Sequence, residues 1–298
     1  MDRKGEIAGI DAGSISVKIV LLDGNGEVLL SRYERHGGRS QDKMLEMLEQ
    51  LIVKHPSVRL AFTGSAGRMA AAAMGAPFVS ELASFSLAAS KLHPEVHTVI
   101  EMGGEDSKLL FLDDSGISDF ALNSVCAAGT GSFLDQQAER MNLSIEQFAE
   151  LALGSKHPPR IAGRCSVFAK SDMIHLQQIA TPLEDIVAGL CFAVARNFKG
   201  SIVRGRPLEP KVAFMGGVAL NRGMVRAFRE IFELDELVIP DNPVTMGALG
   251  AAIKARRDSS AAAPDMDRFR SKVRELSRAD RPKAPLIQAG DRFRERHM

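Results

Sequence analysis

Two segments of this chain, about ninety residues apart, repeat one pattern of a short apolar run, a polar turn and a second apolar run. The turn reads DAGSIS at residues 11–16 and GGEDSK at residues 103–108. The runs have the length of β-strands and the turns contain Gly and Asp, so each copy predicts a hairpin. The repeat limits the fold strongly, because it predicts a duplicated α/β structure with two similar lobes that face one another.

The residues of these turns suit phosphate binding. Glycine allows a tight turn, and the backbone N–H groups and Ser hydroxyls around Gly13, Ser14 and Ser16 can hold phosphate oxygens. Asp11 lies at a strand end and can bind Mg²⁺ through a water molecule. A single copy also fits a plain hairpin in which Asp and Gly only form the turn. The second copy at 103–108 makes a phosphate site between two lobes the stronger interpretation.

A third glycine turn follows an apolar run late in the chain. Residues 212–215 form a predicted buried strand, and the sequence GGVALN at 216–221 leads from it into a predicted helix. Glycines let the backbone approach a flat ligand such as adenosine closely. We therefore expect Gly216, Gly217 and Asn221 to contact the nucleoside part of a nucleotide.

Two of the three cysteines stand where a turn opens a predicted helix. Cys126 precedes the turn Gly129-Thr130-Gly131, and Cys165 directly precedes a second helix. A helix N-terminus carries partial positive charge and unpaired N–H groups, so it favours anions, including a thiolate that can bind a metal or a redox partner. The glycine turn beside Cys126 can also approach phosphate closely. We therefore expect one loop to sense both a nucleotide and a metal cluster.

Other interpretations of these thiols are packing or capping, a zinc site, and a nucleophile. Zinc usually takes four nearby ligands, and His157 and His175 lack a regular spacing from the cysteines. No base can be assigned to a cysteine nucleophile. The third cysteine, Cys191, lies among apolar residues of a helix predicted to begin at Thr181, and it is predicted to be a buried small hydrophobe.

The composition excludes several classes of protein. Hydrophobic residues make up 45% of the chain and charged residues 25%, the usual globular balance. A net charge of +1 gives no strong field that would attract nucleic acid or a membrane. We identify no apolar run of membrane-spanning length and no signal peptide, so a cytoplasmic location is expected. Three cysteines are too few for a disulfide framework.

The same patterns divide the chain into parts. The first lobe, 1–95, contains the first hairpin, and the second lobe, 96–257, contains the second hairpin, the cysteines and the adenosine turn. The final helix of the second lobe, 243–257, is placed so that it can pack back on the first lobe. Beyond it the sequence becomes polar and charged, and 258–298 is expected to be an appendage or linker.

The chain resembles a known superfamily at several motifs. These motifs are GIDAGS at 9–14, GGEDSK at 103–108, CAAGTG at 126–131, CSVFA at 165–169 and GGVALN at 216–221. The glycine turns resemble those of the actin, hexokinase and sugar-kinase ATPase superfamily. Within it, roughly residues 5–256 closely resemble ATP-dependent activators of 2-hydroxyacyl-CoA dehydratases and ATPase subunits of benzoyl-CoA reductase. The cysteine motifs are the specific part, because ordinary sugar kinases lack them.

The resemblance implies a two-lobed α/β fold of the actin and hexokinase type, with ATP or ADP and Mg²⁺ in the cleft between duplicated mixed-sheet lobes. It implies a homodimer that shares one [4Fe-4S] cluster, bound by Cys126 and Cys165 of each chain. ATP hydrolysis would drive transfer of a low-potential electron to a partner 2-hydroxyacyl-CoA dehydratase or related reductase. Ferredoxin or flavodoxin is the electron donor that the resemblance implies.

The resemblance also assigns roles to single residues. Asp11 and Asp106 are candidates for the Mg²⁺ and phosphate end, and Glu105 is a candidate for orienting the attacking water. Lys18 and Lys108 would neutralise phosphate charge. The full set of predicted nucleotide-binding residues is Gly13, Ser14, Ser16, Lys18, Gly103, Gly104, Lys108, Gly129, Thr130, Gly131, Gly216, Gly217 and Asn221.

Glu105 departs from the short activators, many of which have Gln at this position. A carboxylate there can activate water but also repels phosphate, so the rate of hydrolysis stays open. Glu105, with FAKSD at 168–172, looks more like the first ATPase unit of long, multi-unit activases, and the tail ending at 293–297 fits a linker to a following unit. Two other functions stay open: a small-molecule kinase of the same fold, and a nucleotide-switched interaction protein without a cluster.

Overall fold

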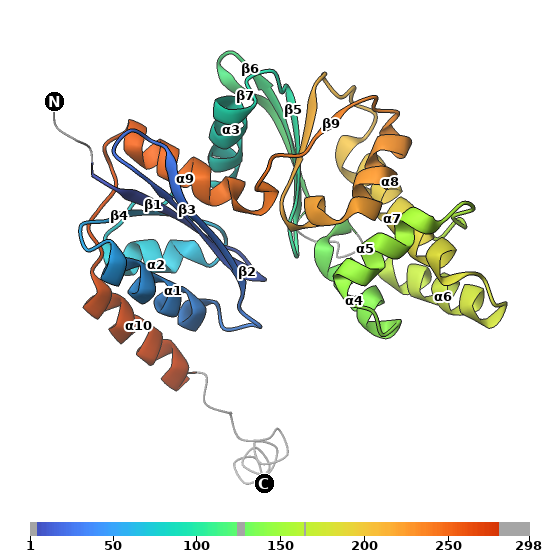
Figure 1. The fold of residues 1–298 in the computed structure, drawn as a ribbon, viewed down its shortest axis with the longest axis horizontal. Coiled ribbons are helices and arrows are strands. Elements are labelled where there is room, and N and C mark those ends of the chain that lie inside the picture. Colours follow the sequence, from blue (N-terminus) through green and yellow to red (C-terminus); the bar gives the residue numbers. More distant parts are fainter. Residues whose placement is uncertain (1–4, 124–128, 164, 280–298) are drawn as a thin grey trace, which may run out of the picture.

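The computed structural model describes residues 5–123, 129–163 and 165–279 of the 298-residue chain. Within them lie two mixed β-sheets (Figure 1). The first sheet has the strand order β3-β2-β1-β4, and the second has the order β7-β6-β5-β8-β9. The strands are β1 (Ile7–Ala12), β2 (Ser16–Leu22), β3 (Val28–Arg35), β4 (Arg59–Thr63), β5 (Thr98–Met102), β6 (Ser107–Asp113), β7 (Gly116–Asn123), β8 (Val212–Met215) and β9 (Leu237–Val238).

The two sheets are built in the same way. In each, a central strand pairs antiparallel with the next strand in the chain and parallel with a later one: β1 with β2 and β4, and β5 with β6 and β8. Strands β3 and β7 then pair antiparallel with β2 and β6. The duplicated α/β lobes predicted from the hairpin repeat are confirmed.

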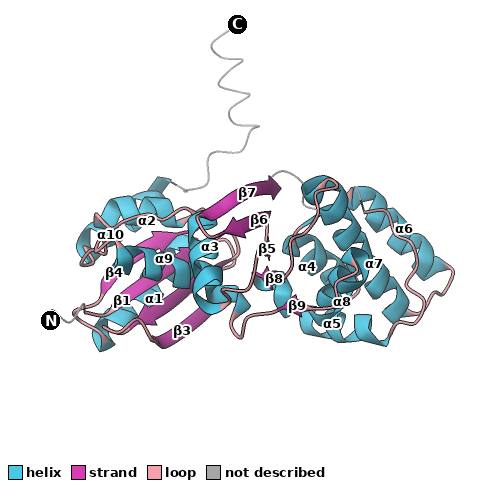
Figure 2. Cartoon of the chain, turned by 90° about the horizontal axis from the view of Figure 1, so that it is seen from above, coloured by secondary structure: helices cyan, strands magenta, loops and turns pink. Residues whose placement is uncertain are grey.

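Helices lie on both faces of each sheet. Helices α1, α2 and α10 cover one face of the first sheet, α3 and α9 lie between the sheets, and α4 to α8 gather beyond the second sheet (Figures 1 and 2). The helices are α1 (Ser40–Lys54), α2 (Gly67–Met74), α3 (Glu81–Leu92), α4 (Gly131–Arg140), α5 (Ile145–Gly154), α6 (Ser166–Gln178), α7 (Leu183–Phe198), α8 (Arg222–Phe232), α9 (Met246–Arg257) and α10 (Met266–Ala279). Short helical turns are η2 (Lys199–Val203), η3 (Gly217–Leu220) and η4 (Pro243–Thr245).

Helix α9 packs very closely on the first sheet and on α3. A Cβ atom on Gly9 of β1 would lie 1.9 Å from the backbone oxygen of Ala248, and one on Gly250 would lie 1.8 Å from the backbone oxygen of Ser84. Both positions need glycine, because any side chain would collide with backbone atoms. This contact brings the last part of the 96–257 region against β1, the strand that contains Asp11.

The chain beyond Arg257 contributes to the core of the first lobe. Ala262 forms an isolated bridge with Leu60 of β4, and α10 buries Phe269 and Val273 in the apolar cluster that contains residues of α1 and α2. The apolar residues occupy one face of an otherwise charged helix, so overall composition conceals this packing.

Two serines cap helices in a way that the residues next to them favour. Ser80 Oγ accepts a hydrogen bond from the backbone N of Ala83 (3.3 Å) at the start of α3, and Ser144 forms a capping box at α5. Cys191 is fully buried in α7, as predicted. Helix α7 has Pro182 as its N-cap, one residue after the predicted start. Strand β7 was not predicted, because it is largely exposed and polar.

One helical stretch, Leu183–Val203, is long and apolar enough to cross a membrane. This corrects the expectation that no stretch reaches that length. Of its most apolar window, 78% is buried inside the protein. Burial on all sides accounts for its composition, so it is the central core helix of the second half.

Candidate functional site

A cleft of about 230 Å³ lies between the two hairpins and helices α4 and α5. An adjoining cavity of about 240 Å³ shares several lining residues with it. The predicted site residues that line the cleft are Asp11, Ser16, Lys18, Gly103, Gly104, Gly131, Gly216, Gly217 and Asn221. Those that line only the adjoining cavity are Gly13, Ser14, Glu105, Asp106 and Lys108. The tertiary structure therefore brings together residues from three separate glycine turns.

The first hairpin presents one lysine–carboxylate pair to the cleft. Lys18 Nζ lies 3.2 Å from Asp11 Oδ2, and Asp11 is almost fully buried. Burial lowers the pKa of Lys18, but the ion pair with Asp11 and the nearby Glu101 outweigh burial, so its pKa is raised overall. The turn is closed by a hydrogen bond from Gly13 N to Ser16 O (3.0 Å). Lys18 is thus a firmly charged group at the hairpin end of the cleft.

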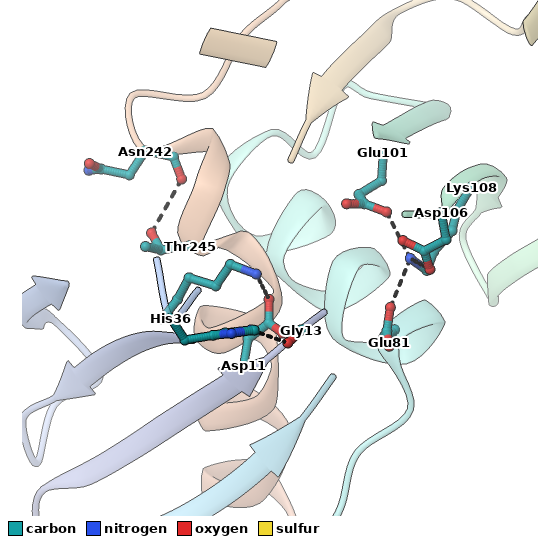
Figure 3. Close-up of polar contacts among 10 residues, drawn as sticks. Asp11, Gly13, His36, Glu81, Glu101, Asp106, Lys108, Asn242 and Thr245 are labelled. Carbon is teal, nitrogen blue, oxygen red and sulfur yellow. Dashed lines mark hydrogen bonds and ion pairs between the residues drawn. The ribbon is translucent and has the colours of Figure 1, made fainter. Parts of the chain in front are cut away.

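The second hairpin surrounds its lysine with three carboxyl groups. Lys108 Nζ lies 2.8 Å from Glu101, 2.6 Å from Asp106 and 2.8 Å from Glu81 at the start of α3 (Figure 3). Burial lowers the pKa of Lys108, but these carboxyl groups more than offset it, so its pKa is raised. Burial raises the pKa of Glu101 to about 7 against the opposing effect of Lys108. This end of the cleft carries more acidic groups than basic ones.

Glu101 is a site residue that the sequence reasoning missed. In the β1–β2 register Asp11 faces Lys18, and in the β5–β6 register Glu101 faces Lys108. The structural equivalent of Asp11 is therefore Glu101, whereas Asp106 occupies the position of Ser16. A residue-by-residue alignment of the two hairpins at their constant spacing would have found it, since Lys18 and Lys108 supply the register.

Glycines let the strand ends approach one another. Gly64 follows β4 and Gly216 follows β8, with φ of +86° and +88°, a region that favours glycine. A Cβ on Gly64 would lie 2.4 Å from the backbone oxygen of Ala12, and one on Gly216 would lie 2.4 Å from that of Met102. The duplication therefore extends to the glycine after the parallel strand. Gly64 was not among the predicted residues.

The other end of the cleft is more apolar and contains an amide with a free donor. The amide oxygen of Asn221 caps α8 by accepting a hydrogen bond from Met224 N (3.0 Å). Its Nδ2 is buried and has no hydrogen-bond partner among the described residues. The remaining lining residues here include Leu134, Ile145, Ala149, Val218, Leu220 and Val244. A buried donor beside an apolar wall and the glycine turn fits a nucleoside.

Two contacts cross the cleft between the lobes. Arg35 at the end of β3 forms an ion pair with Asp135 of α4 (2.8 Å), and both side chains line the cleft. At the hairpin turns, a Cβ on Gly104 would lie 2.1 Å from Cγ1 of Ile15. The first turn therefore rests against the second, and Gly104 leaves room for Ile15.

Cys126 itself lies outside the described residues, but both flanks of its segment contact the second hairpin. Asn123, the last residue of β7, is paired with Ser107 in the strand register. Ser107 Oγ also donates a hydrogen bond to Gly129 O (3.1 Å). Gly131 N donates to Gly103 O (2.9 Å), and Ser132 N donates to Gly104 O (2.8 Å). The start of α4 is thus attached to the hairpin backbone, and the predicted residues Gly129 and Thr130 do not line the cleft.

The other two cysteines lie in different environments. Cys165 is the N-cap residue of α6, is partly exposed and forms no disulfide, and it does not line the cleft. Burial raises the pKa of the Cys191 thiol to about 12, which keeps it neutral. Within the described parts of the chain, no group of three or more His, Cys, Asp or Glu side chains is arranged to hold a metal ion.

Comparisons with known proteins agree with this arrangement. The 2-hydroxyisocaproyl-CoA dehydratase activator of Clostridioides difficile is 36% identical over 255 residues, covering 83% of this chain and 93% of that protein. The structure of the Clostridium difficile activator with bound ADPNP superposes with a TM-score of 0.75 at 29% identity, over 94% of this chain and 99% of that one. Component A of the Acidaminococcus fermentans (R)-2-hydroxyglutaryl-CoA dehydratase gives a TM-score of 0.78 at 30% identity, over 86% and 99%.

The family model that matches describes the BadF/BadG/BcrA/BcrD ATPases and covers residues 8–255. That range contains both hairpins, the cleft and all three cysteines. The chain therefore belongs to the BadF/BadG/BcrA/BcrD ATPase family.

Proposed function

We propose that the chain is an ATP-hydrolysing activator that passes a low-potential electron to a partner 2-hydroxyacyl-CoA dehydratase or related reductase. The observation that carries this proposal is the attachment of the Cys126 segment to a phosphate hairpin. Residues on both sides of 124–128 are held by the second hairpin, through Ser107 and the backbone of Gly103 and Gly104. A displacement of that hairpin at the nucleotide would therefore reach the cysteine segment through one or two hydrogen bonds.

The hairpin end of the cleft suits a nucleotide bound together with Mg²⁺. The carboxyl groups of Glu101, Asp106 and Glu81 outnumber the Lys108 ammonium that they surround, and this excess repels a bare phosphate. A divalent cation between carboxylate and phosphate oxygens removes the repulsion. Asp11, Glu101 and Asp106 would hold hydrated Mg²⁺ through water molecules. Lys18 would neutralise charge from the opposite hairpin.

The remaining groups bind the nucleoside and position water. The nucleotide would lie against the backbone of Gly216 and Gly217, and the buried Nδ2 of Asn221 would donate a hydrogen bond to it. Glu105 is exposed on the second turn and lines the adjoining cavity. From there it would orient the attacking water.

A [4Fe-4S] cluster needs about four thiolates, and one chain has three cysteines, of which Cys191 is buried in the core. We infer that two chains share one cluster across a two-fold axis, which supplies low-potential electron transfer when bound. Val167 and Phe168, just after Cys165, each expose 66% of their surface. An apolar surface beside a cysteine ligand suits contact with a second chain or with the dehydratase.

The test is a measurement of iron and acid-labile sulfide after anaerobic purification. We expect about four iron and four sulfide per two chains in the wild type. Cys126→Ser and Cys165→Ser should each lose them, while Cys191→Ala, which alters a buried thiol within the core, should keep them. An iron-free wild type that hydrolyses ATP would overturn the electron-transfer proposal and favour a kinase or a nucleotide switch.

The cellular setting follows from the same proposal. Electron transfer to a CoA-ester enzyme requires a cytoplasmic partner and a low-potential donor, for which ferredoxin or flavodoxin is proposed. Reduction of the purified protein by each donor, followed by activation of a dehydratase with and without ATP, would identify the pair. Activation that proceeds equally without ATP would contradict the role of hydrolysis.

A further inference from the structure

Asn197 occupies a buried position between Gly163 and Gly129. It lies in the last turn of α7 and is 7% exposed. Its Nδ2 donates a hydrogen bond to the backbone oxygen of Gly163, which precedes Cys165 by two residues. The side chain therefore holds the approach to the Cys165 helix.

The opposite side of the same amide faces Gly129, which follows the Cys126 segment in the sequence. A Cβ on Gly129, the first described residue after 124–128, would lie only 3.3 Å from Asn197 Oδ1. Ser201 Oγ lies 2.7 Å from the backbone oxygen of Asn197 and 3.0 Å from its Oδ1, and the hydroxyl proton shared between these two acceptors helps to fix the orientation of the amide. The donor side of Asn197 thus holds Gly163, and its acceptor side lies close enough to Gly129 to leave little room for a side chain there.

Gly129 connects this amide to the second phosphate hairpin. Its backbone oxygen accepts a hydrogen bond from Ser107 Oγ (3.1 Å), and Ser107 directly follows Asp106. Ser107 is completely buried. Two hydrogen bonds and one close approach therefore link the hairpin turn to Gly163: Ser107 bonds to Gly129, Gly129 packs beside Asn197, and Asn197 bonds to Gly163. Polar contacts in such a buried setting are costly to break, so neighbouring groups tend to move together.

We infer that Asn197 is a positioning residue that transmits displacements of the second phosphate hairpin to the Cys165 segment, and so makes both cysteine segments respond to one nucleotide. This inference rests on the proposed function, in which the cleft binds ATP and ADP. Asn197 does not line the cleft, and its role is mechanical. Without it, the Cys126 side keeps its direct attachment through Ser107, and the Cys165 side loses its connection.

The test compares the rate at which iodoacetamide alkylates Cys165 in the ADP state and in the state with a non-hydrolysable ATP analogue. Full-length protein is used after anaerobic removal of iron with a chelator, because a thiolate bound to a cluster does not react with iodoacetamide. Mass spectrometry resolves each cysteine, with buried Cys191 as an unreactive internal reference. We expect a different rate in the two states of the wild type. Asn197→Leu keeps the side-chain volume and removes the amide. In this variant the ratio of the two alkylation rates should shrink by about fivefold, the effect expected for the loss of one buried hydrogen bond.

A matched control is Thr98→Val, which breaks another buried side-chain hydrogen bond to a backbone oxygen, that of Glu209, away from the cysteines. It should keep the wild-type ratio. A second variant, Ser201→Ala, removes the group that orients the amide and should reduce the ratio partly, even if Asn197→Leu does not fold. ADP affinity should stay within about threefold in all folded variants, because none of these residues touches the cleft.

The outcomes separate the inference from the proposed function. Equal alkylation in both states of the wild type, with nucleotide bound, would contradict the proposed coupling itself. A nucleotide-dependent ratio that persists in Asn197→Leu and in Ser201→Ala would overturn the role of Asn197 and leave the proposed function standing. Loss of the ratio in Thr98→Val as well would reduce the effect to general destabilisation and also overturn it.

Discussion

The two hairpins share a backbone and differ in what surrounds it. Both pair a lysine with a carboxylate in the same register, and both close the turn with a 3.0 Å hydrogen bond from the first glycine. In the first, Lys18 lies 3.2 Å from Asp11. In the second, Lys108 lies within 2.8 Å of three carboxyl groups. The two hairpins therefore have the same backbone geometry, but the charges around their lysines differ.

The surroundings behind the two hairpins differ as well. The first is packed against α9, where Gly9 leaves no space between the backbones of β1 and the helix. The second is attached to the flanks of the Cys126 segment and to the start of α4. This comparison suggests that the first hairpin is a fixed support and the second is the responsive one. The predictions below test that difference, from the largest expected effect to the smallest.

Removing the two lysines should have unequal effects. Lys108→Met leaves three acidic groups without their cation and should lower the free energy of unfolding by about 3–5 kcal/mol at neutral pH. Lys18→Met leaves one acidic group, Asp11, without its cation and should lower the free energy of unfolding by about 1–2 kcal/mol. Urea unfolding followed by circular dichroism would measure both. The Lys108→Met loss should shrink in acid, where the carboxyl groups are neutral, and equal losses for both variants would show that the hairpins are electrostatically alike.

Glu101 should make stability depend on pH. Its pKa is raised from 4.5 to about 7 in the folded chain, so the folded state binds more protons than the unfolded state between these values. The free energy of unfolding contributed by this group should be fully present below pH 4.5 and fall as pH rises to 7, by at most about 3 kcal/mol. Glu101→Gln should remove this slope in nucleotide-free urea titrations. An unchanged slope would assign the pH dependence to other groups.

Gly9 should not tolerate a side chain, although its structural equivalent in β5, Val99, has one. The two residues occupy the same register in β1 and β5, yet α9 leaves no room for a side chain on Gly9. Gly9→Ala should lower the free energy of unfolding by about 1–3 kcal/mol. Gly200→Ala, where nothing lies within 4 Å of the new Cβ, is the matched control and should be nearly neutral. A neutral Gly9→Ala would mean that α9 is not firmly seated.

The ion pair between the lobes should have the smallest effect. Asp135→Asn removes the Arg35 contact across the cleft and should accelerate release of a fluorescent ADP analogue by about two- to fivefold, less at high salt, because the pair is partly exposed. The control is Asp119→Asn, which breaks an Arg–Asp pair of the same 2.8 Å length within the second lobe. Equal release rates in wild type and Asp135→Asn would show that this pair does not hold the lobes together.

Much of the fold could be predicted because its signals are local. The hairpin repeat, the apolar runs and the caps at Ser80 and Ser144 depend on neighbours within a few residues. The elements that could not be predicted depend on residues far away in the sequence. Strand β7 is an edge strand with an exposed face, and α10 is a charged helix whose only apolar face meets α1 and α2.

The site shows the same division. Asp11, the lysines and the glycine turns were predictable from their motifs, and the cleft brings nine of the predicted residues together. Glu101 was missed because a carboxylate inside an apolar strand gives no local signal. Glu81 was missed because it lies at the start of α3, outside the hairpin that contains Lys108. Asn197 gives no signal at all, since a lone amide in an apolar helix acquires a role only from the glycines packed on either side.

The sequence by itself determined the elements and their duplication, because strand length, glycine turns and capping side chains act over a few residues. Only the tertiary structure decided which carboxylate faces which lysine, since strand register sets that pairing. It also decided that α9 seals the first hairpin and that Asn197 lies between Gly163 and Gly129. Such contacts join residues far apart in the chain, and burial gives them their strength by excluding the water that would otherwise replace each partner.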